Sequence, residues 1–464
     1  MATPEPGGST CLASRRPPRQ RFLERSAPRW NSTTWSSPRI SRPSRYTAGP
    51  RRCRSDSAGR VPRPSAGWSS SGPVAGVTKS RELWLVAVVG AAACGGRAAP
   101  TGEPGAPLPG LGPAELARFQ AGAELFNRVF SPAEGLGPAF NENQCSACHT
   151  SPASGGVGGE RVLKASRFDP RTGCNQLVDA GGENVRRQLT PHARALGLGR
   201  EAPPPGAQTG RFTAPALFGL GLVDAVPDAT LLAEQGAEHA DHDGTSGRVG
   251  RTADGRVGRF GRKADVATLA EFTATALRFE MGLTTSRYPR DAVQGQRVPP
   301  HADEAPDPEV ADSVVARLTD FVRFLAPPGR LPPRTGQAAA TAARGERQFA
   351  QIGCAACHVP ALTTGPSPVA ALDRRPVALY SDLLLHDVGP ALADVCGPGA
   401  TPSELRTAPL MGLRYRELLL HDGRVTSLRD AILLHGGEAR AARDRFAALS
   451  AAQEAELIAF LKTL

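Results

Sequence analysis

Two copies of the pentapeptide Cys-x-x-Cys-His constrain this chain of 464 residues more than any other feature. In this motif both thiols can add to the vinyl groups of a c-type haem, and the adjacent histidine can then ligate the iron from one side. A redox-active thiol pair or half of a zinc site is the alternative, but neither needs the histidine that ends both copies. The motifs therefore predict two covalently bound haems, held by Cys145, Cys148 and His149 and by Cys354, Cys357 and His358.

The net charge of +11 lies entirely in the first 76 residues, which hold 14 arginines, no lysine and three acidic residues. The rest of the chain is therefore electrically balanced, and nothing in it predicts a nucleic-acid partner. Residues 1–76 are also rich in serine and proline and lack apolar periodicity, so we expect a disordered leader. Our hypothesis is that translation starts near Val77 and that residues 1–76 are not made, and a real disordered tail is the alternative.

Residues 77–94 have the composition of an export signal. A short charged stretch precedes the apolar run Leu83–Ala93, and Cys94 follows three alanines. The run is too short for a transmembrane helix, and its small-residue end is typical of a secretory signal. Cys94 resembles the lipid-modified cysteine of a lipoprotein, although the usual leucine three residues earlier is missing. We therefore expect a periplasmic protein that a lipid at Cys94 anchors to a bacterial membrane.

Two further cysteines, Cys174 and Cys396, lie outside the haem motifs, the leader and the signal. An exported protein could join them in a disulfide. Their positions in the sequence do not show whether they are close in space, so both states stay open.

The two haem motifs stand in halves with the same order of elements. Each motif follows a Gly-x-x-x-Phe segment, which begins at Gly122 or Gly345. Each half ends with a predicted helix, at 313–326 and 450–464, whose apolar residues lie on one face. The glycine of the first helix would let the backbones of the two helices cross closely. This order predicts a mainly α fold of two cytochrome c-like domains, each binding one haem, with long loops. We place a linker at 95–110, an N-terminal domain with insertions at 111–328 and a C-terminal domain at 329–464.

Several further segments match a known family, namely residues 135–140, 212–221, 258–264, 380–389, 420–423 and 427–436. On these segments the chain resembles the di-haem oxidoreductases of the di-haem cytochrome c peroxidase/MauG superfamily. The resemblance implies one haem that transfers electrons with two protein ligands, and a second haem whose open distal side reacts with peroxide.

The resemblance places His435 where the peroxidases have a distal methionine for the C-terminal haem and MauG enzymes have a tyrosine. It implies that His358 and His435 ligate this iron from its two sides, which lowers the reduction potential relative to methionine ligation. His421 and His386 are rivals, because each sits in a motif that could face a haem. Simple packing of His435 near a helix end is the remaining alternative.

The resemblance also matches Glu280 to the distal glutamate of the peroxidases. A carboxylate above an open iron could move a proton between the two peroxide oxygens as their bond breaks. Most glutamates, however, are solvated side chains on a helix face. Met281 or His192 could instead ligate the first haem, which would make that haem an electron carrier.

The chain departs from the superfamily in its aromatic residues. The superfamily relays electrons between the haems through a tryptophan, but all four tryptophans of this chain precede Cys94. Phe260 and Arg262 stand where we expect the relay residue, and Tyr380 and Tyr415 are the other aromatic candidates.

Residues 241–247 resemble a calcium loop, because closely spaced carboxylates precede a turn glycine. The segment lacks the later bidentate acid of an EF-hand, so a plain polar turn is the favoured interpretation. In the superfamily calcium binds between the domains, at other positions. Whether the protein binds calcium therefore stays open.

These observations favour an exported di-haem oxidoreductase of the peroxidase type. Electrons would enter at the C-terminal haem, and an oxidant would be reduced at the N-terminal haem beside Glu280. The partners would be a small electron-donor protein or a quinol-linked donor, and hydrogen peroxide or another small oxidant. The alternatives are a two-haem electron-transfer protein without substrate chemistry and a MauG-like oxidase of a partner.

Overall fold

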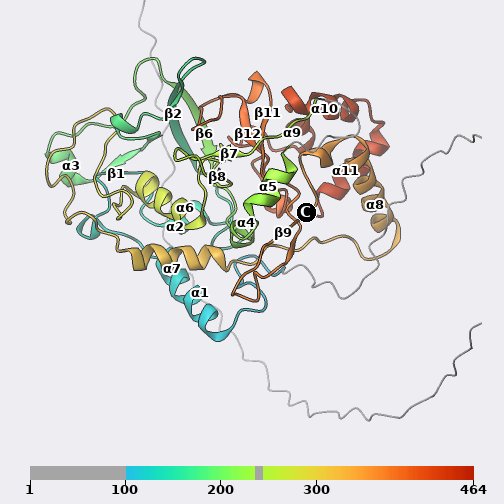
Figure 1. The fold of residues 1–464 in the computed structure, drawn as a ribbon, viewed down its shortest axis with the longest axis horizontal. Coiled ribbons are helices and arrows are strands. Elements are labelled where there is room, and N and C mark those ends of the chain that lie inside the picture. The colour runs from blue at the N-terminus through green and yellow to red at the C-terminus, as the bar shows by residue number, and fades with distance from the viewer. Residues whose placement is uncertain (1–100, 236–243) are drawn as a thin grey trace, which may run out of the picture. The chain divides into compact units, whose positions relative to one another are not determined.

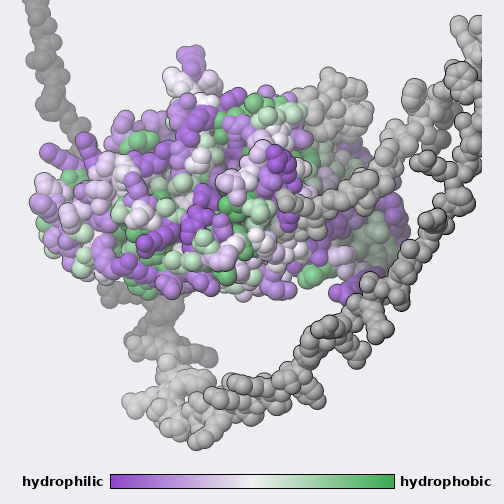
Figure 2. Space-filling model, turned by 60° about the horizontal axis from the view of Figure 1, so that its bottom comes forward, coloured by the Kyte–Doolittle hydropathy of each residue, from purple (hydrophilic) through white to green (hydrophobic). Residues whose placement is uncertain are grey.

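The computed structural model describes residues 101–235 and 244–464, which belong to one compact unit. The predicted leader, the export signal and Cys94 lie outside the described residues. No helix among the described residues is long and apolar enough to cross a membrane. On the face shown in Figure 2, hydrophilic residues dominate and hydrophobic residues form small, separate groups.

Short helices joined by long connections make up most of the described chain (Figure 1). The helices are α1 (Pro113–Phe126), α2 (Cys145–Cys148), α3 (Pro191–Ala195), α4 (Leu220–Asp224), α5 (Asp228–Glu234), α6 (Leu269–Ala276), α7 (Asp312–Arg323), α8 (Gly336–Gln351), α9 (Leu428–Leu433), α10 (Arg440–Ala447) and α11 (Ala451–Leu461). Both predicted closing helices are present, as α7 and α11. The predicted capping box of α11 is also present, because Ser450 and Gln453 bond each other's backbone N–H groups.

Two helix pairs cross at glycines, as the sequence predicts. A Cβ atom on Gly122 of α1 would lie 2.2 Å from the carbonyl oxygen of Arg317 in α7. A Cβ atom on Gly345 of α8 would lie 1.9 Å from the carbonyl oxygen of Glu456 in α11. Only glycine fits at such distances, so the backbones touch directly in both pairs. Figure 1 shows α1 beside α7 and α8 beside α11.

The phenylalanine of each Gly-x-x-x-Phe segment joins its helix pair to the haem motif. Phe126 packs on Phe321 of α7, with ring centroids 4.7 Å apart, and lies 6.1 Å from the ring of His149. In the second half, the ring of Phe349 lies 5.3 Å from that of Phe460 in α11 and 6.4 Å from that of His358. The repeat seen in the sequence is therefore a repeat of side-chain packing.

Antiparallel strands occupy the insertion of the first half, which the mainly α prediction did not anticipate. The long strand β2 (Arg161–Asp169) pairs with β3 (Gly173–Asn175), β4 (Asn184–Val185) and β6 (Gln208–Thr213). The other strands form four two-stranded ladders. They are β1 (Ala139–Phe140) with β5 (Gln188–Leu189), β7 (Gly250–Arg251) with β8 (Val257–Gly258), β9 (Leu362–Thr363) with β10 (Pro376–Val377) and β11 (Leu385–Asp387) with β12 (Glu404–Arg406).

Two hydrophobic clusters hold most of the core. The first packs α1, α4, α6 and α7 together, and the second packs α8, α9, α10 and α11. The first cluster also contains Leu379 and Leu383 from the second half of the chain. The boundary between 111–328 and 329–464 therefore stays a prediction, because the two halves share part of one core.

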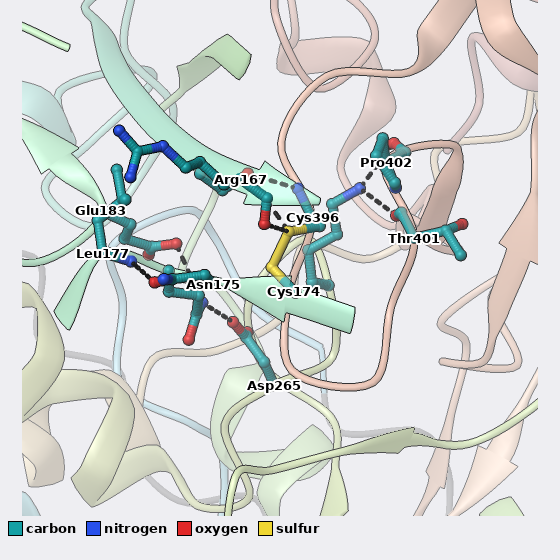
Figure 3. Close-up of a disulfide and its surroundings, with 12 residues drawn as sticks. Arg167, Cys174, Asn175, Leu177, Glu183, Asp265, Cys396, Thr401 and Pro402 are labelled. Atoms are coloured by element: carbon teal, nitrogen blue, oxygen red, sulfur yellow. Dashed lines mark hydrogen bonds between the residues drawn. A yellow bond between two sulfur atoms is a disulfide. The ribbon is translucent and has the colours of Figure 1, made fainter. Parts of the chain in front are cut away.

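A disulfide joins Cys174 of β3 to Cys396, which settles the pairing that the sequence left open (Figure 3). The two Cα atoms lie 5.6 Å apart, although 222 positions separate the residues in the sequence. Cys396 is completely buried, and its backbone N–H donates to Ser166 Oγ of β2 at 3.0 Å. The bond ties the sheet of the first half to a loop of the second half.

Replacing Cys174 and Cys396 together by serine is expected to lower the free energy of unfolding by about 2–5 kcal/mol, because the cross-link closes a long loop and restricts the unfolded chain. Denaturant unfolding of the holoprotein measures the change. A matched pair of serine substitutions at the exposed residues Thr150 and Gly159 controls for surface effects. An unchanged unfolding midpoint would contradict the predicted contribution.

Candidate functional site

The first haem motif lines a large cavity. Cys145 and Cys148 are the first and last residues of α2, and His149 follows directly. The walls of the cavity also include Phe126, Phe212, Phe260, Arg262, Phe272, Glu280, Met281, Leu318, Val322, Arg406, Met411 and Arg416. The motif, the predicted proton-transfer acid and the alternative ligand Met281 therefore meet in one place.

The histidine of this motif can bind a metal through Nε2. Its Nδ1–H donates to the carbonyl oxygen of Gly156 at 3.1 Å, which leaves Nε2 as the unprotonated ring nitrogen. Burial lowers the pKa of His149, so the ring is neutral at pH 7. A neutral imidazole with its tautomer set by a backbone carbonyl is the form that ligates iron.

The second motif repeats this arrangement. The Nδ1–H of His358 donates to the carbonyl oxygen of Tyr380 at 2.9 Å. Burial, with a smaller contribution from nearby His435, lowers the pKa of His358 to about 4. His435 follows α9 and donates its own Nδ1–H to the carbonyl oxygen of Ala431 at 2.8 Å, and burial lowers its pKa as well. His358 and His435 are thus neighbours that are both neutral, with Nε2 as the nitrogen able to bind a metal.

Two carboxylates hold His386, the first of the rival histidines. His386 donates Nε2–H to Asp382 and Nδ1–H to Glu438, both at 2.8 Å. Although burial opposes it, these bonds and the contact with Cys357 raise the pKa of His386 to about 12. The ring is therefore protonated on both nitrogens and has no lone pair for iron. Nε2 of His421 lies 2.7 Å from Asp394 Oδ2.

Burial keeps three of the four motif thiols protonated. Burial raises the pKa of Cys145 and of Cys354 to about 12. It also raises the pKa of Cys148 to about 12, with a smaller contribution from the charge of Glu280. Burial raises the pKa of Cys357 as well, but its contact with His386 opposes this shift. Thiolates are the reactive and metal-binding form, and burial disfavours them at the other three thiols. Among the described residues, the one cysteine in a group that could hold an ion is Cys357, with Asp382 and His386.

Glu280 is held in place by two neutral amides. The Nδ2–H groups of Asn141 and Asn184 donate to its Oε2 at 2.7 Å and its Oε1 at 2.8 Å. Glu280 lies in a π-helical turn, Leu277–Met281, that continues α6 and ends at Gly282. A Cβ atom on Gly282 would lie 2.4 Å from the carbonyl oxygen of Ala139, so the turn rests directly on β1. The two asparagines belong to no recognisable motif, and the sequence did not point to them.

The other predicted candidates are spread more widely. Phe260 and Arg262 line the cavity, whereas Tyr380 lies at the second motif and Tyr415 contacts Arg414. His192 instead donates Nε2–H to the carbonyl oxygen of His301 at 2.9 Å. All four tryptophans lie outside the described residues, as do the first three residues of the calcium-like segment 241–247. No relay aromatic is therefore identified by position alone.

Three arginines of the cavity wall lack a carboxylate partner. Arg262, Arg406 and Arg416 donate to the backbone carbonyl oxygens of Thr213, Gly261 and Pro409, respectively, and form no ion pair within the described residues. Burial and mutual repulsion lower the pKa of Arg262 to about 9 and of Arg406 to about 10. Uncompensated positive charge in a cavity fits an anionic ligand, and the two propionates of a haem have this charge. The cavity thus fits a haem, which the histidine geometry also supports.

The site offers the donors that a haem-binding redox protein needs, namely histidines that can ligate a metal and positive charge for an anionic cofactor. The chain matches the family model "Di-haem oxidoreductase, putative peroxidase" over residues 206–464, and it belongs to this family of peroxidase-like oxidoreductases with haem cofactors. This confirms the resemblance seen in the sequence. A comparison with curated proteins found no match.

Solved structures show only a distant likeness. The diheme peroxidase BthA from Burkholderia thailandensis is 17% identical, with 75% of this chain and 86% of that chain covered and a TM-score of 0.36. Hydrazine synthase from Kuenenia stuttgartiensis is 16% identical, with 53% and 87% covered and a TM-score of 0.26. A MauG-like protein associated with microbial copper homeostasis is 16% identical, with 52% and 90% covered and a TM-score of 0.27. At these scores the likeness adds nothing to the family assignment.

Replacing Arg262 by glutamine is expected to lower the reduction potential of the N-terminal haem, because a nearby positive charge favours the reduced iron. At an effective dielectric constant of about 20, a unit charge at about 10 Å contributes about 1.7 kcal/mol, or about 70 mV for a one-electron couple. Spectroelectrochemical titration measures the shift. Arg262→Lys keeps the charge and should change the potential much less. Equal potentials for wild type and Arg262→Gln would contradict this role.

Proposed function

We propose that the protein is an exported di-haem c-type cytochrome oxidoreductase that reduces peroxide or another small oxidant at the N-terminal haem. The observation that carries this proposal is that Glu280 lines the same cavity as Cys145, Cys148 and His149. A bound haem supplies the redox chemistry of iron. His149 would ligate its iron, Cys145 and Cys148 would attach it, and Glu280 would supply a carboxylate in the same cavity.

Glu280 is suited to moving a proton. Its two oxygens accept hydrogen bonds from amides, which orient the carboxylate without neutralising it as a lysine or arginine would. Each oxygen keeps a further lone pair that can take up a proton from one oxygen of the substrate and return it to the other. The apolar residues of the cavity wall, such as Phe272 and Leu318, limit the access of water.

His358 and His435 support electron transfer at the C-terminal haem. They are neighbours, both are neutral and both have Nε2 available. Two strong imidazole ligands would close both faces of this iron to substrate and lower its reduction potential relative to histidine–methionine ligation. In this proposal electrons enter here and pass to the N-terminal haem.

A specific observation favours the runner-up function, a two-haem electron carrier. Met281 and Met411 both line the cavity of the first motif, and either thioether could ligate the iron opposite His149. Such ligation would leave no open position for substrate. A MauG-like oxidase of a partner protein would need the same open cavity and a different substrate.

Export is part of the proposal. A disulfide such as Cys174–Cys396 persists in oxidising compartments, which supports a periplasmic location. The proposed lipid anchor at Cys94 lies outside the described residues. The proposed partners are a small electron-donor protein or a quinol-linked donor, and hydrogen peroxide or another small oxidant.

Glu280→Gln is expected to slow peroxide turnover by about 10²–10⁴-fold, because the amide cannot exchange a proton as the carboxylate does. Stopped-flow assays with hydrogen peroxide measure turnover, and absorption spectra check that both haems remain attached. Glu124→Gln, at an exposed position of α1, is the matched control. Full turnover in Glu280→Gln would contradict the assigned role, and a protein with only low-spin iron and no peroxide reaction would favour the electron carrier.

His435→Met is expected to raise the reduction potential of the C-terminal haem by at least about 0.1 V, within the roughly 0.8 V that axial ligands span. Potentiometric titration followed by EPR measures the change and the ligand set. His192→Gln, which alters a histidine bonded to a backbone carbonyl, is the control. If the potential and the EPR signal stay the same, another residue ligates this iron.

A further inference from the structure

Four carboxylates outside the haem cavity lie close together between the π-helical turn and α7. Asp291, Asp303, Asp307 and Glu309 each place an oxygen within 4.8 Å of the others. None of the four lines the cavity of the first motif. Like charges at this separation repel one another unless protons or a cation lie among them.

The cluster contains buried oxygens that no protein donor satisfies. The Asp303 side chain is only 6% exposed, and its Oδ2 has no hydrogen-bond partner among the described residues. Asp291 Oδ1 and Glu309 Oε1 are also buried and have no hydrogen-bond partner among the described residues. Buried carboxylates are normally paired or coordinate a metal, so a cation is the partner that these oxygens fit.

We propose that these four residues bind one calcium ion. Carboxylate oxygens are the ligands of hard cations, and calcium accepts about six to eight oxygens in a flexible arrangement. Magnesium requires near-ideal octahedral geometry and usually keeps several waters, which a group of four acids from one irregular segment suits less well. The site differs from the calcium-like segment 241–247 in position and in residues.

The calcium ion fastens the chain that follows Glu280. The N–H and Oγ1 of Thr284 donate to Glu309 Oε2 at 2.6 and 2.7 Å, and Oγ1 also lies 2.8 Å from Asp307 Oδ1. Thr284 stands four positions after Glu280, just beyond the π-helical turn. A cation that immobilises Asp307 and Glu309 therefore immobilises the end of this turn. The link to catalysis rests on the proposed function, whereas calcium binding itself does not.

The test uses the full-length holoprotein after dialysis against EGTA. Titration with calcium chloride, followed by calorimetry, should show one ion per chain, and calcium should raise the melting temperature. Asp303→Asn and Asp307→Asn should each weaken binding by at least about tenfold, because ligand charge sets affinity. Asp307 is exposed, so its variant remains informative if Asp303→Asn fails to fold. Glu304→Gln, an exposed acid of the same segment, should bind calcium like the wild type.

Three results would overturn the site. The first is that no calcium binds up to about 1 mM, which is the weak limit for extracellular sites. The second is that magnesium binds more tightly than calcium. The third is that both aspartate variants bind calcium with unchanged affinity. The third result would place the ion elsewhere, for example at 241–247. Calcium binding with full peroxide turnover in the calcium-free protein would overturn only the link to Glu280. Loss of turnover in Glu280→Gln tests the proposed function separately.

Discussion

The contact on which both haem centres depend is a helix crossing at a glycine. At Gly122 and at Gly345 the neighbouring backbone lies where a Cβ atom would be, so each first helix touches its closing helix directly. This closeness brings the phenylalanine one turn later onto the closing helix and beside the histidine of the motif. A larger side chain at either glycine would separate the helices and displace the wall against which the histidine packs.

The electrostatic surroundings of the two motifs differ. At the second motif His358 and nearby His435 are both neutral, whereas Asp382 and Glu438 keep His386 protonated, so His386 has no lone pair for iron. At the first motif the cavity carries three arginines bonded only to backbone carbonyls and one carboxylate held by amides. The two neutral histidines at the second motif suit ligation of one iron from both sides. The arginines and the carboxylate at the first motif suit an anionic cofactor and a proton-transfer group in the same cavity.

Sequence reasoning succeeded where the signal is local. The glycine crossings, the closing helices and the capping box at Ser450 follow from spacing within one segment, and the structure confirms them. It did not find the sheet around β2, the amides of Asn141 and Asn184, or the acids between Asp291 and Glu309. Each of these depends on residues far apart in the chain that only folding brings together, and no spacing rule encodes that proximity.

By itself, the sequence determined the chemistry that the chain can perform, because two Cys-x-x-Cys-His motifs position thiols and histidine within one turn of backbone. Through resemblance to a family, it also predicted Glu280 as the residue that transfers the proton. Only the tertiary structure decided which histidines are free to bind a metal, that Glu280 shares a cavity with the first motif, and that Cys174 meets Cys396. The physical reason is that hydrogen-bond partners and burial set the tautomer and the charge of a side chain. Segments that are distant in the sequence supply those partners and that burial.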